Sequence, residues 1–190
     1  MKNAKSLIAA VALATASLGS SAVMAADVSS PAQNIDVVGT SGFFGDAFAA
    51  GTAGSTFSDQ FNFTVSGTTP TNFDAIVSSI SRTASTGLDI TALSLYGPAT
   101  GGGTGGGTGG GTLIASGTSL QSGAIDVWTL TSDNLAAGNY YVQVSGTLVS
   151  ATSGAFGGAV NLAPVPEPET YGMLLAGLGL VGFMARRRKV

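Results

Sequence analysis

The clearest hydrophobic pattern in the chain is a strict alternation over residues 57–65. One face of this stretch carries Phe57, Asp59, Phe61, Phe63 and Val65, and the other carries only serine, glutamine, asparagine and threonine. Because successive side chains of a strand point to opposite faces, a period of two predicts a half-buried β-strand. The same pattern places an acid, Asp59, on the face that turns toward the core.

Shorter apolar runs predict further strands along the middle of the chain. They are separated by Gly, Ser, Thr and Asn and occupy residues 34–38, 73–80, 88–96, 113–115, 125–131, 140–147 and 156–162. Residues 39–56 contain three phenylalanines in a Gly- and Ala-rich sequence and favour no single state. Many short strands without a helical period predict an all-β fold, an antiparallel β-sandwich.

Two glycine-containing segments connect predicted strands. Before residues 140–147, Gly138 can take the positive φ of a tight turn, which leaves Tyr140, Val142 and Val144 facing inward. The sequence GGGTGGGTGGGT at residues 101–112 predicts a flexible surface loop, because glycine loses much conformational freedom on ordering. We expect a spacer, and threonines that accept glycans are the alternative.

The N-terminal apolar run does not alternate. Two lysines precede residues 7–18, and the small residues Val23 and Ala25 follow them. This order predicts a secretory signal peptide that is cut after Ala25, with Ala26 as the alternative, and implies the Sec translocon and signal peptidase as partners. The predicted organisation is a signal peptide helix at 1–25, a β-sandwich passenger at 26–163 and a C-terminal segment at 164–190.

The C-terminal segment has three parts in a fixed order. They are the triplet Pro166, Glu167 and Pro168, the uncharged apolar run 171–185, and the basic cluster Arg186, Arg187, Arg188 and Lys189. Fifteen residues form a helix of roughly 22 Å, so this predicted transmembrane helix fits only a thinned bilayer or one with snorkelling flanks. The basic cluster would keep the C-terminus in the cytoplasm and the passenger on the far side.

In its triplet, apolar run and basic end, this segment resembles the PEP-CTERM sorting signal of Gram-negative bacteria. The resemblance implies an intermediate in the inner membrane, recognition and cleavage near the triplet by exosortase, and delivery to the cell surface or extracellular matrix. A plain single-pass anchor is the alternative. Phe57, Asp59 and Phe61 also resemble the motif of the FxDxF PEP-CTERM family, whose members share export signals and a β-rich passenger without assigned chemistry.

A second resemblance concerns the fold. The sequence LAAGNYYVQVSG at residues 135–146, together with residues 93–96, resembles the end strands of secreted modules of the bacterial pre-peptidase C-terminal type. It implies a jelly-roll-like sandwich of that type. Such modules are accessory domains.

The passenger is strongly acidic. Arg82 is its only base, against eight aspartates and no glutamate, which gives a net charge of about −7. Phosphate backbones require clustered Lys and Arg, so nucleic acid is not an expected partner.

The chain contains no cysteine and no histidine. A disulfide framework, Ser-His-Asp and Cys-His catalysis and His-ligated zinc are therefore excluded. Paired carboxylates remain chemically possible, but the aspartates occur singly along the sequence, so we expect no enzyme and no cofactor.

Two function classes remain. The first is a structural or adhesive component of the extracellular matrix, and the resemblance to sorted proteins implies a role in biofilm or floc with exopolysaccharide. The second is a binding module, either for polysaccharide through Trp128, Tyr96 or Tyr141, or for calcium through aspartates. The alternative for each of these aromatic residues is an ordinary structural position in the core or on the surface of a strand.

Asp59 needs a partner, because an ionised carboxylate among apolar side chains is costly. Three are possible: Arg82, backbone amides at the strand end, or a calcium ion shared with another aspartate. We favour Arg82 or the amides, because calcium takes six to eight oxygens and no Asp-rich loop of that spacing occurs.

Overall fold

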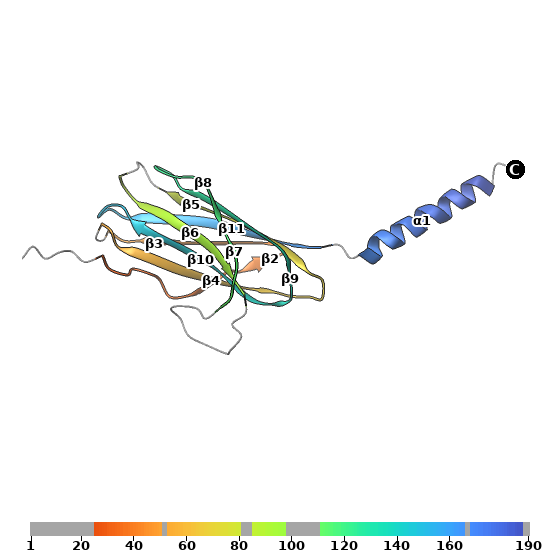
Figure 1. Ribbon diagram of the computed structural model, residues 1–190, viewed down its shortest axis with the longest axis horizontal. Coiled ribbons are helices and arrows are strands. Elements are labelled where there is room, and N and C mark those ends of the chain that lie inside the picture. The colour runs from red at the N-terminus through yellow and green to blue at the C-terminus, as the bar shows by residue number, and fades with distance from the viewer. Residues whose placement is uncertain (1–24, 51–52, 81–84, 98–110, 166–167, 188–190) are drawn as a thin grey trace, which may run out of the picture.

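A computed structural model describes residues 25–50, 53–80, 85–97, 111–165 and 168–187. Over these residues the chain forms eleven strands in two sheets, followed by one helix (Figure 1). The predicted signal peptide, apart from Ala25, lies outside the described residues. So does most of the predicted loop at 101–112.

Sheet A has five strands and sheet B has six. In spatial order, sheet A contains β1 (Gln33–Asn34), β4 (Thr56–Val65), β10 (Gly138–Leu148), β6 (Leu88–Tyr96) and β7 (Leu113–Ser116). Sheet B contains β2 (Val37–Val38), β3 (Ser41–Phe48), β11 (Gly154–Pro164), β5 (Thr71–Ile80), β9 (Val127–Leu135) and β8 (Thr118–Gln121). The described residues thus confirm the predicted all-β sandwich.

The connectivity sends successive long strands to opposite sheets. β3, β4, β5 and β6 alternate between sheets B and A, and β9, β10 and β11 do so again, as in a jelly roll. Every described pair is antiparallel except β1 with β4. This alternation brings β3 and β4 to neighbouring edges of the two sheets.

Three short or irregular elements differ from the prediction. The expected strand at 34–38 is two strands, because the chain passes from sheet A to sheet B with Ile35 buried between them. Strand β3 was not predicted, since Phe43 is 81% exposed beside buried Phe44 and two adjacent phenylalanines hide the period of two. Strand β8 was also not predicted, because its four residues are all exposed and mostly polar.

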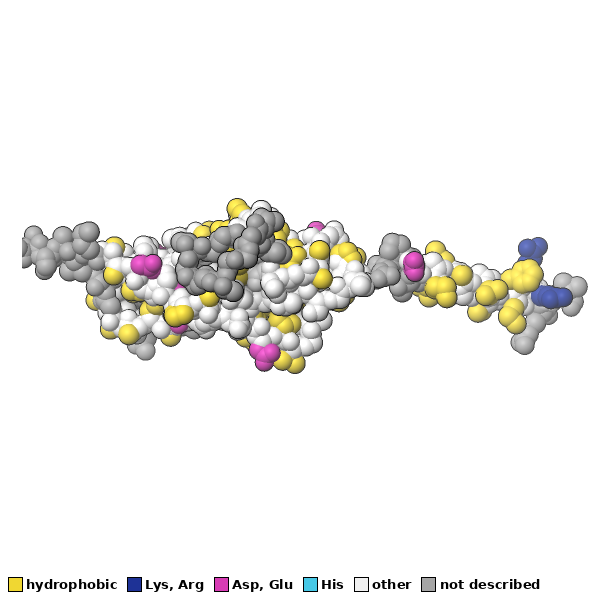
Figure 2. All heavy atoms as spheres, turned by 90° about the horizontal axis from the view of Figure 1, so that it is seen from below, with side chains coloured by type: hydrophobic (Ala, Val, Ile, Leu, Met, Phe, Trp, Pro, Cys, Tyr) yellow, Lys and Arg dark blue, Asp and Glu magenta, His cyan; other side chains and the backbone are white. Residues whose placement is uncertain are grey.

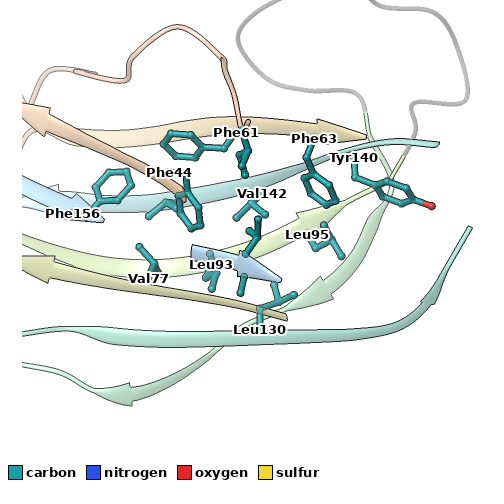
Figure 3. Packing of buried hydrophobic residues seen from close by; sticks show 14 of the residues in the cluster. Phe44, Phe61, Phe63, Val77, Leu93, Leu95, Leu130, Tyr140, Val142 and Phe156 are labelled. Atoms are coloured by element: carbon teal, nitrogen blue, oxygen red, sulfur yellow. The ribbon is translucent and has the colours of Figure 1, made fainter. Parts of the chain in front are cut away.

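The core lies between the two sheets and is rich in aromatic rings (Figure 3). Phe57 stacks on Phe156 with ring centroids 5.5 Å apart, and the rings of Phe44 and Phe61 are 5.0 Å apart across the sheets. Gly158 of β11 makes room for Phe44, because a Cβ there would lie 2.3 Å from its ring. Tyr140, Val142 and Val144 face inward as predicted.

The predicted conformation of Gly138 is wrong. Gly138 begins β10, and the residue with positive φ in this turn is Asn134, at 59°. Asparagine tolerates this conformation better than most residues. The turn is held instead by the Tyr140 hydroxyl, which donates a hydrogen bond of 2.8 Å to the carbonyl of Ala136.

The helix α1 (Pro168–Arg187) follows the sandwich, and its residues from Tyr171 on are all exposed. Over the described residues, no helix is long and apolar enough to cross a membrane, which corrects the predicted transmembrane helix. The reason is the composition of α1: Glu169, Arg186 and Arg187 lie within it, and four glycines interrupt its apolar run. In the described part of the chain, every residue of the hydrophobic core lies before α1, so the sandwich does not need this helix for its core.

Candidate functional site

The candidate site lies inside the sandwich, where β4 of sheet A faces β3 of sheet B. Asp59 sits on the inward face of β4, as predicted, between Phe57 and Phe61, and is 1% exposed. Its neighbour on β10 is the fully buried Val144. A carboxyl group in this position has lost nearly all its contact with water.

Only one oxygen of Asp59 has a protein donor. The amide of Ser30 donates a hydrogen bond of 2.7 Å to Asp59 Oδ1. Asp59 Oδ2 is buried and has no hydrogen-bond partner. A buried acceptor without a donor costs roughly 1–3 kcal/mol, so this oxygen requires an explanation.

The group that faces Asp59 is a second acid, Asp46 of β3. Asp46 lies on the inward face of β3 between Phe44 and Phe48 and is half-buried. Its Oδ1 accepts a hydrogen bond of 2.7 Å from the amide of Ala47, whereas its Oδ2 is buried without a partner. Its neighbours on β3 meet the neighbours of Asp59 on β4, since the ring centroids of Phe44 and Phe61 are 5.0 Å apart and those of Phe48 and Phe57 are 4.7 Å apart, so Asp46 and Asp59 lie opposite each other. We call Asp46 and Asp59 the carboxyl pair.

Burial dominates the electrostatics of the pair. Burial and, to a smaller extent, the neighbouring Asp46 raise the pKa of Asp59 to about 6, although the hydrogen bond from Ser30 lowers it. Asp27 adds a weaker repulsion from the exposed end of the same edge. The pKa of Asp27 itself is lowered by hydrogen bonds from the Ser29 hydroxyl and amide.

The segment of residues 27–35, here the N-terminal segment, covers this edge of the sandwich. The Val28 amide bonds the Thr56 carbonyl, the Ile35 amide bonds the Asn62 carbonyl, and Ser29 Oγ accepts from the Ser58 amide at 2.8 Å. The Ser30 bond to Asp59 lies in the middle of these contacts. The ionisation of Asp59 is therefore coupled to the packing of this segment.

A second buried aspartate, Asp126, offers an internal comparison. It is 2% exposed, and its carboxylate accepts hydrogen bonds from the amides of Ile90 (2.9 Å) and Gly123 (3.2 Å) and from Ser79 Oγ (3.4 Å). Its own amide donates to Ser79 Oγ at 2.8 Å. Both oxygens of Asp126 are thus satisfied by neutral donors.

The predicted partners of Asp59 can now be assessed. A backbone amide does donate to Asp59 Oδ1, but it comes from Ser30 of the N-terminal segment and not from a turn at the end of β4. Arg82 lies outside the described residues. In the described part of the chain, no group of three or more acidic side chains that could hold a metal ion is present, although the pair brings two aspartates together.

The aromatic residues predicted to bind polysaccharide, Trp128, Tyr96 and Tyr141, differ in their contacts and burial. Tyr96 and Tyr141 stack with centroids 4.8 Å apart, but Tyr141 is only 7% exposed because Gly111 packs against its ring. Trp128 is half-buried, packs against the core and donates its indole N–H to the Ile90 carbonyl at 3.0 Å. Tyr141 is therefore buried, whereas Trp128 and Tyr96 are both half-buried.

The outer face of sheet A is an uncharged polar surface, which we call the amide face. All ten outward positions of β4 and β10 are uncharged, and neighbouring strands place Asn62 beside Tyr141 and Gln60 beside Gln143. Gln143 Nε2 donates to Ser58 Oγ at 2.7 Å, and Thr64 Oγ1 donates to Asn139 Oδ1 at 2.9 Å. Figure 2 shows how sparse charged side chains are over the sandwich compared with the end of α1.

The sorting segment is described only in its central part. Pro166, Glu167, Arg188 and Lys189 lie outside the described residues. Pro168 begins α1, with Glu169 in the first turn and Arg186 and Arg187 in the last. The acidic side chain at the N-terminal end and the basic side chains at the C-terminal end interact favourably with the helix dipole. Glu169 and the side chains from Tyr171 to Arg187 are exposed and are not part of the core cluster.

Sequence reasoning missed Asp46 and Asp126. A signal for Asp46 was present, since it follows Phe44 and precedes Phe48 at the same period of two that revealed Asp59. That Asp46 faces Asp59 depends on the packing of two sheets and is not visible in local sequence. The same holds for Asp126, whose donors come from residues far along the chain.

Comparison with known proteins identifies the C-terminal segment. Residues 164–189 match the PEP-CTERM protein-sorting motif, so the chain carries the signal of an exported protein that is sorted by exosortase. No curated protein matches the chain. The chain is also similar to a solved structure, the pre-peptidase C-terminal domain of collagenase from Bacillus anthracis, with 15% identity and a TM-score of 0.34 over 68% of this chain and 94% of that chain. The FxDxF resemblance of Phe57, Asp59 and Phe61 stays a prediction.

Proposed function

We propose that this chain, which carries a PEP-CTERM protein-sorting motif behind a β-sandwich, delivers that sandwich to the surface or extracellular matrix of a Gram-negative bacterium. There the sandwich serves as a structural and adhesive component of an exopolysaccharide-containing biofilm or floc. Its partners on the way are the Sec translocon, signal peptidase, the inner membrane and exosortase. The proposed role is not enzymatic.

The observation that carries this proposal is the order of the parts. The matched motif begins at residue 164, where β11 ends, and the last contact of the sandwich is the Val165 amide with the Pro70 carbonyl. Cleavage near residues 166–168 would therefore remove α1 without removing a strand or a core side chain. The exposed apolar surface of α1 supports recognition by a membrane enzyme.

The buried acids support a non-catalytic role. Glycoside hydrolases also use two carboxyl groups, but theirs flank a substrate bond and lie about 5 to 9.5 Å apart. Asp59 is 1% exposed and its free oxygen is buried, so no substrate bond can reach it. This pair belongs to the inside of the fold.

Sorting is tested by replacing Pro166, Glu167 and Pro168 with alanine in the producing bacterium. We expect the variant to stay with the cells in its longer, unprocessed form while the native protein reaches the surface or medium in a shorter form. A variant that is processed and delivered like the native protein would contradict the proposal. As the control, replacement of the exposed Thr118, Gln121 and Thr131 by alanine leaves the motif intact and should not block processing.

The amide face favours a second function, binding of neutral polysaccharide. Sugar hydroxyls pair with uncharged amide and hydroxyl groups, and the half-buried Tyr96 adds an aromatic ring beside Tyr141. The absence of charge at the outward positions of β4 and β10 disfavours acidic or basic polymers as partners. Because these side chains lie in rows along adjacent strands, the amide face suits an extended polysaccharide chain.

Polysaccharide binding is tested by sedimentation of residues 26–165 with insoluble neutral glucans and with exopolysaccharide of the producing strain. We expect the double variant Gln60→Ala and Gln143→Ala to lose most binding, with an unchanged thermal midpoint. Thr131→Ala, which alters an exposed side chain of sheet B, is the matched control. Equal binding by all three proteins would exclude the amide face.

A further inference from the structure

Two buried carboxylate oxygens with no donor lie at one place in this molecule. Asp59 Oδ2 belongs to sheet A and Asp46 Oδ2 belongs to sheet B, and the ring contacts of Phe44 with Phe61 and of Phe48 with Phe57 on either side bring the two residues opposite each other. Two ionised carboxylates in that arrangement would repel each other without compensation. A proton or a cation between the two carboxylates would reduce their repulsion and would give both unpaired oxygens a partner.

We propose that Asp46 and Asp59 share one proton, which links the two sheets by an acid–carboxylate hydrogen bond and which is released as the surroundings become neutral. The proton resides on one Oδ2 and is donated to the other. On release it passes to solvent and leaves two anions at the edge that the N-terminal segment covers. This hydrogen bond makes the folded passenger more stable at acidic pH than at neutral pH.

The geometry assigns the proton to the Oδ2 atoms. Each Oδ1 already accepts a backbone hydrogen bond, from Ser30 for Asp59 and from Ala47 for Asp46, both at 2.7 Å. An acceptor that is engaged by an amide is the poorer site for a proton. The proton belongs to the pair as a unit, so the two groups titrate together.

A proton suits the site better than a calcium ion. Calcium takes six to eight oxygens, and the described residues contain no group of three or more acids around the pair. The remaining neighbours of Asp59 on its own face are phenylalanines, with Val144 beside it on β10. A proton needs only the two oxygens that are present.

The charged groups that face the pair are few. Asp46 comes from β3, and Asp27 of the N-terminal segment adds a weaker repulsion. Burial and the neighbouring Asp46 both raise the pKa of Asp59, to about 6, which puts proton release between mildly acidic and neutral pH. In that range the folded pair holds more protons than the unfolded chain, so stability falls as pH rises through about 6.

The test measures the thermal midpoint of residues 26–165 between pH 4.5 and 8 for the native sequence, Asp59→Asn, Asp46→Asn and Asp74→Asn. Asp74 is exposed, so its variant removes one charge of the same sign without touching the pair. We expect the native protein and Asp74→Asn to lose several degrees between pH 5 and 7.5. Both pair variants should lose clearly less, because an asparagine amide donates to the remaining carboxylate at every pH.

Two results would overturn the proposal. One is a set of parallel profiles for all four proteins, which would mean that the pair holds no proton of its own. The other is a midpoint at pH 7.5 that rises by several degrees with 5 mM calcium in the native protein and Asp74→Asn but in neither pair variant, which would make the site a cation site. A pair variant that does not fold at all, while the other does, leaves the test to the second variant.

Discussion

Asp59 and Asp126 are both buried aspartates, yet their surroundings are opposite in kind. Asp126 lies just before β9 of sheet B and receives the Ile90 amide of sheet A and two further neutral donors. Asp59 of sheet A receives one amide and faces another acid from sheet B. The difference teaches that burial alone does not say what a carboxylate does: its donors decide whether it is a fixed structural acceptor or a group that binds a proton.

The largest effect is expected at Asp126. In Asp126→Asn an amide group would face the N–H of Ile90 or Gly123 in place of an oxygen, so a buried hydrogen bond becomes a repulsive contact. We expect the free energy of unfolding to fall by about 2–3 kcal/mol at any pH between 5 and 8. Urea unfolding of residues 26–165 measures this, and a loss below about 0.5 kcal/mol would show that the network of Asp126 contributes little.

The same substitution at Asp59 should have the opposite sign. At pH 7.5 Asp59→Asn removes one of two repelling anions and supplies an N–H for Asp46, while Oδ1 still accepts from Ser30. We expect a gain of about 1–2 kcal/mol, less than the full pKa shift implies because solvent reaches Asp46 and screens the pair. At pH 4.5 the gain should vanish, since the native pair is then protonated. Destabilisation at pH 7.5 would place Asp59 in the same class as Asp126.

A smaller effect is expected at Ser30, the donor to Asp59 Oδ1. Ser30→Pro removes the amide proton, whereas Ser30→Ala retains it and serves as the control. Because this hydrogen bond favours the ionised form, its loss should move the pH-dependent fall in stability to higher pH and cost about 1 kcal/mol at pH 7.5. A Pro variant whose pH profile matches that of the Ala variant would show that the N-terminal segment is not coupled to the pair.

The sequence could predict those strands whose apolar residues follow a clear local pattern. The alternation in β4 placed Asp59 inside, and the strands β5, β6 and β10 followed from similar runs. Strand β3 was not predicted, because exposed Phe43 adjoins buried Phe44 and hides the alternation. Asp46, which lies on this strand, was missed for the same reason. The candidate site needs both strands, so it became visible only when the two sheets were packed.

Other failures have the same physical origin. Tyr141 alternates as a surface residue should, yet Gly111 from a distant segment covers it. Gly138 looked like the turn residue, but Asn134 takes the positive φ. The sorting segment was predictable because its motif is contiguous and needs no tertiary contact to be recognised.

The most direct measurement of the shared proton is a pH titration of the aspartate carboxyl carbons by NMR in ¹³C-labelled protein, residues 26–165. The account predicts that the Asp59 signal titrates with a midpoint near 6 and that the Asp46 signal changes in the same step, because one proton belongs to both. In Asp46→Asn, the Asp59 midpoint should fall, since its acidic neighbour is gone. If the Asp59 signal instead titrates near the ordinary aspartate value of about 4, with the same midpoint in Asp46→Asn, the two residues share no proton and the central claim is wrong.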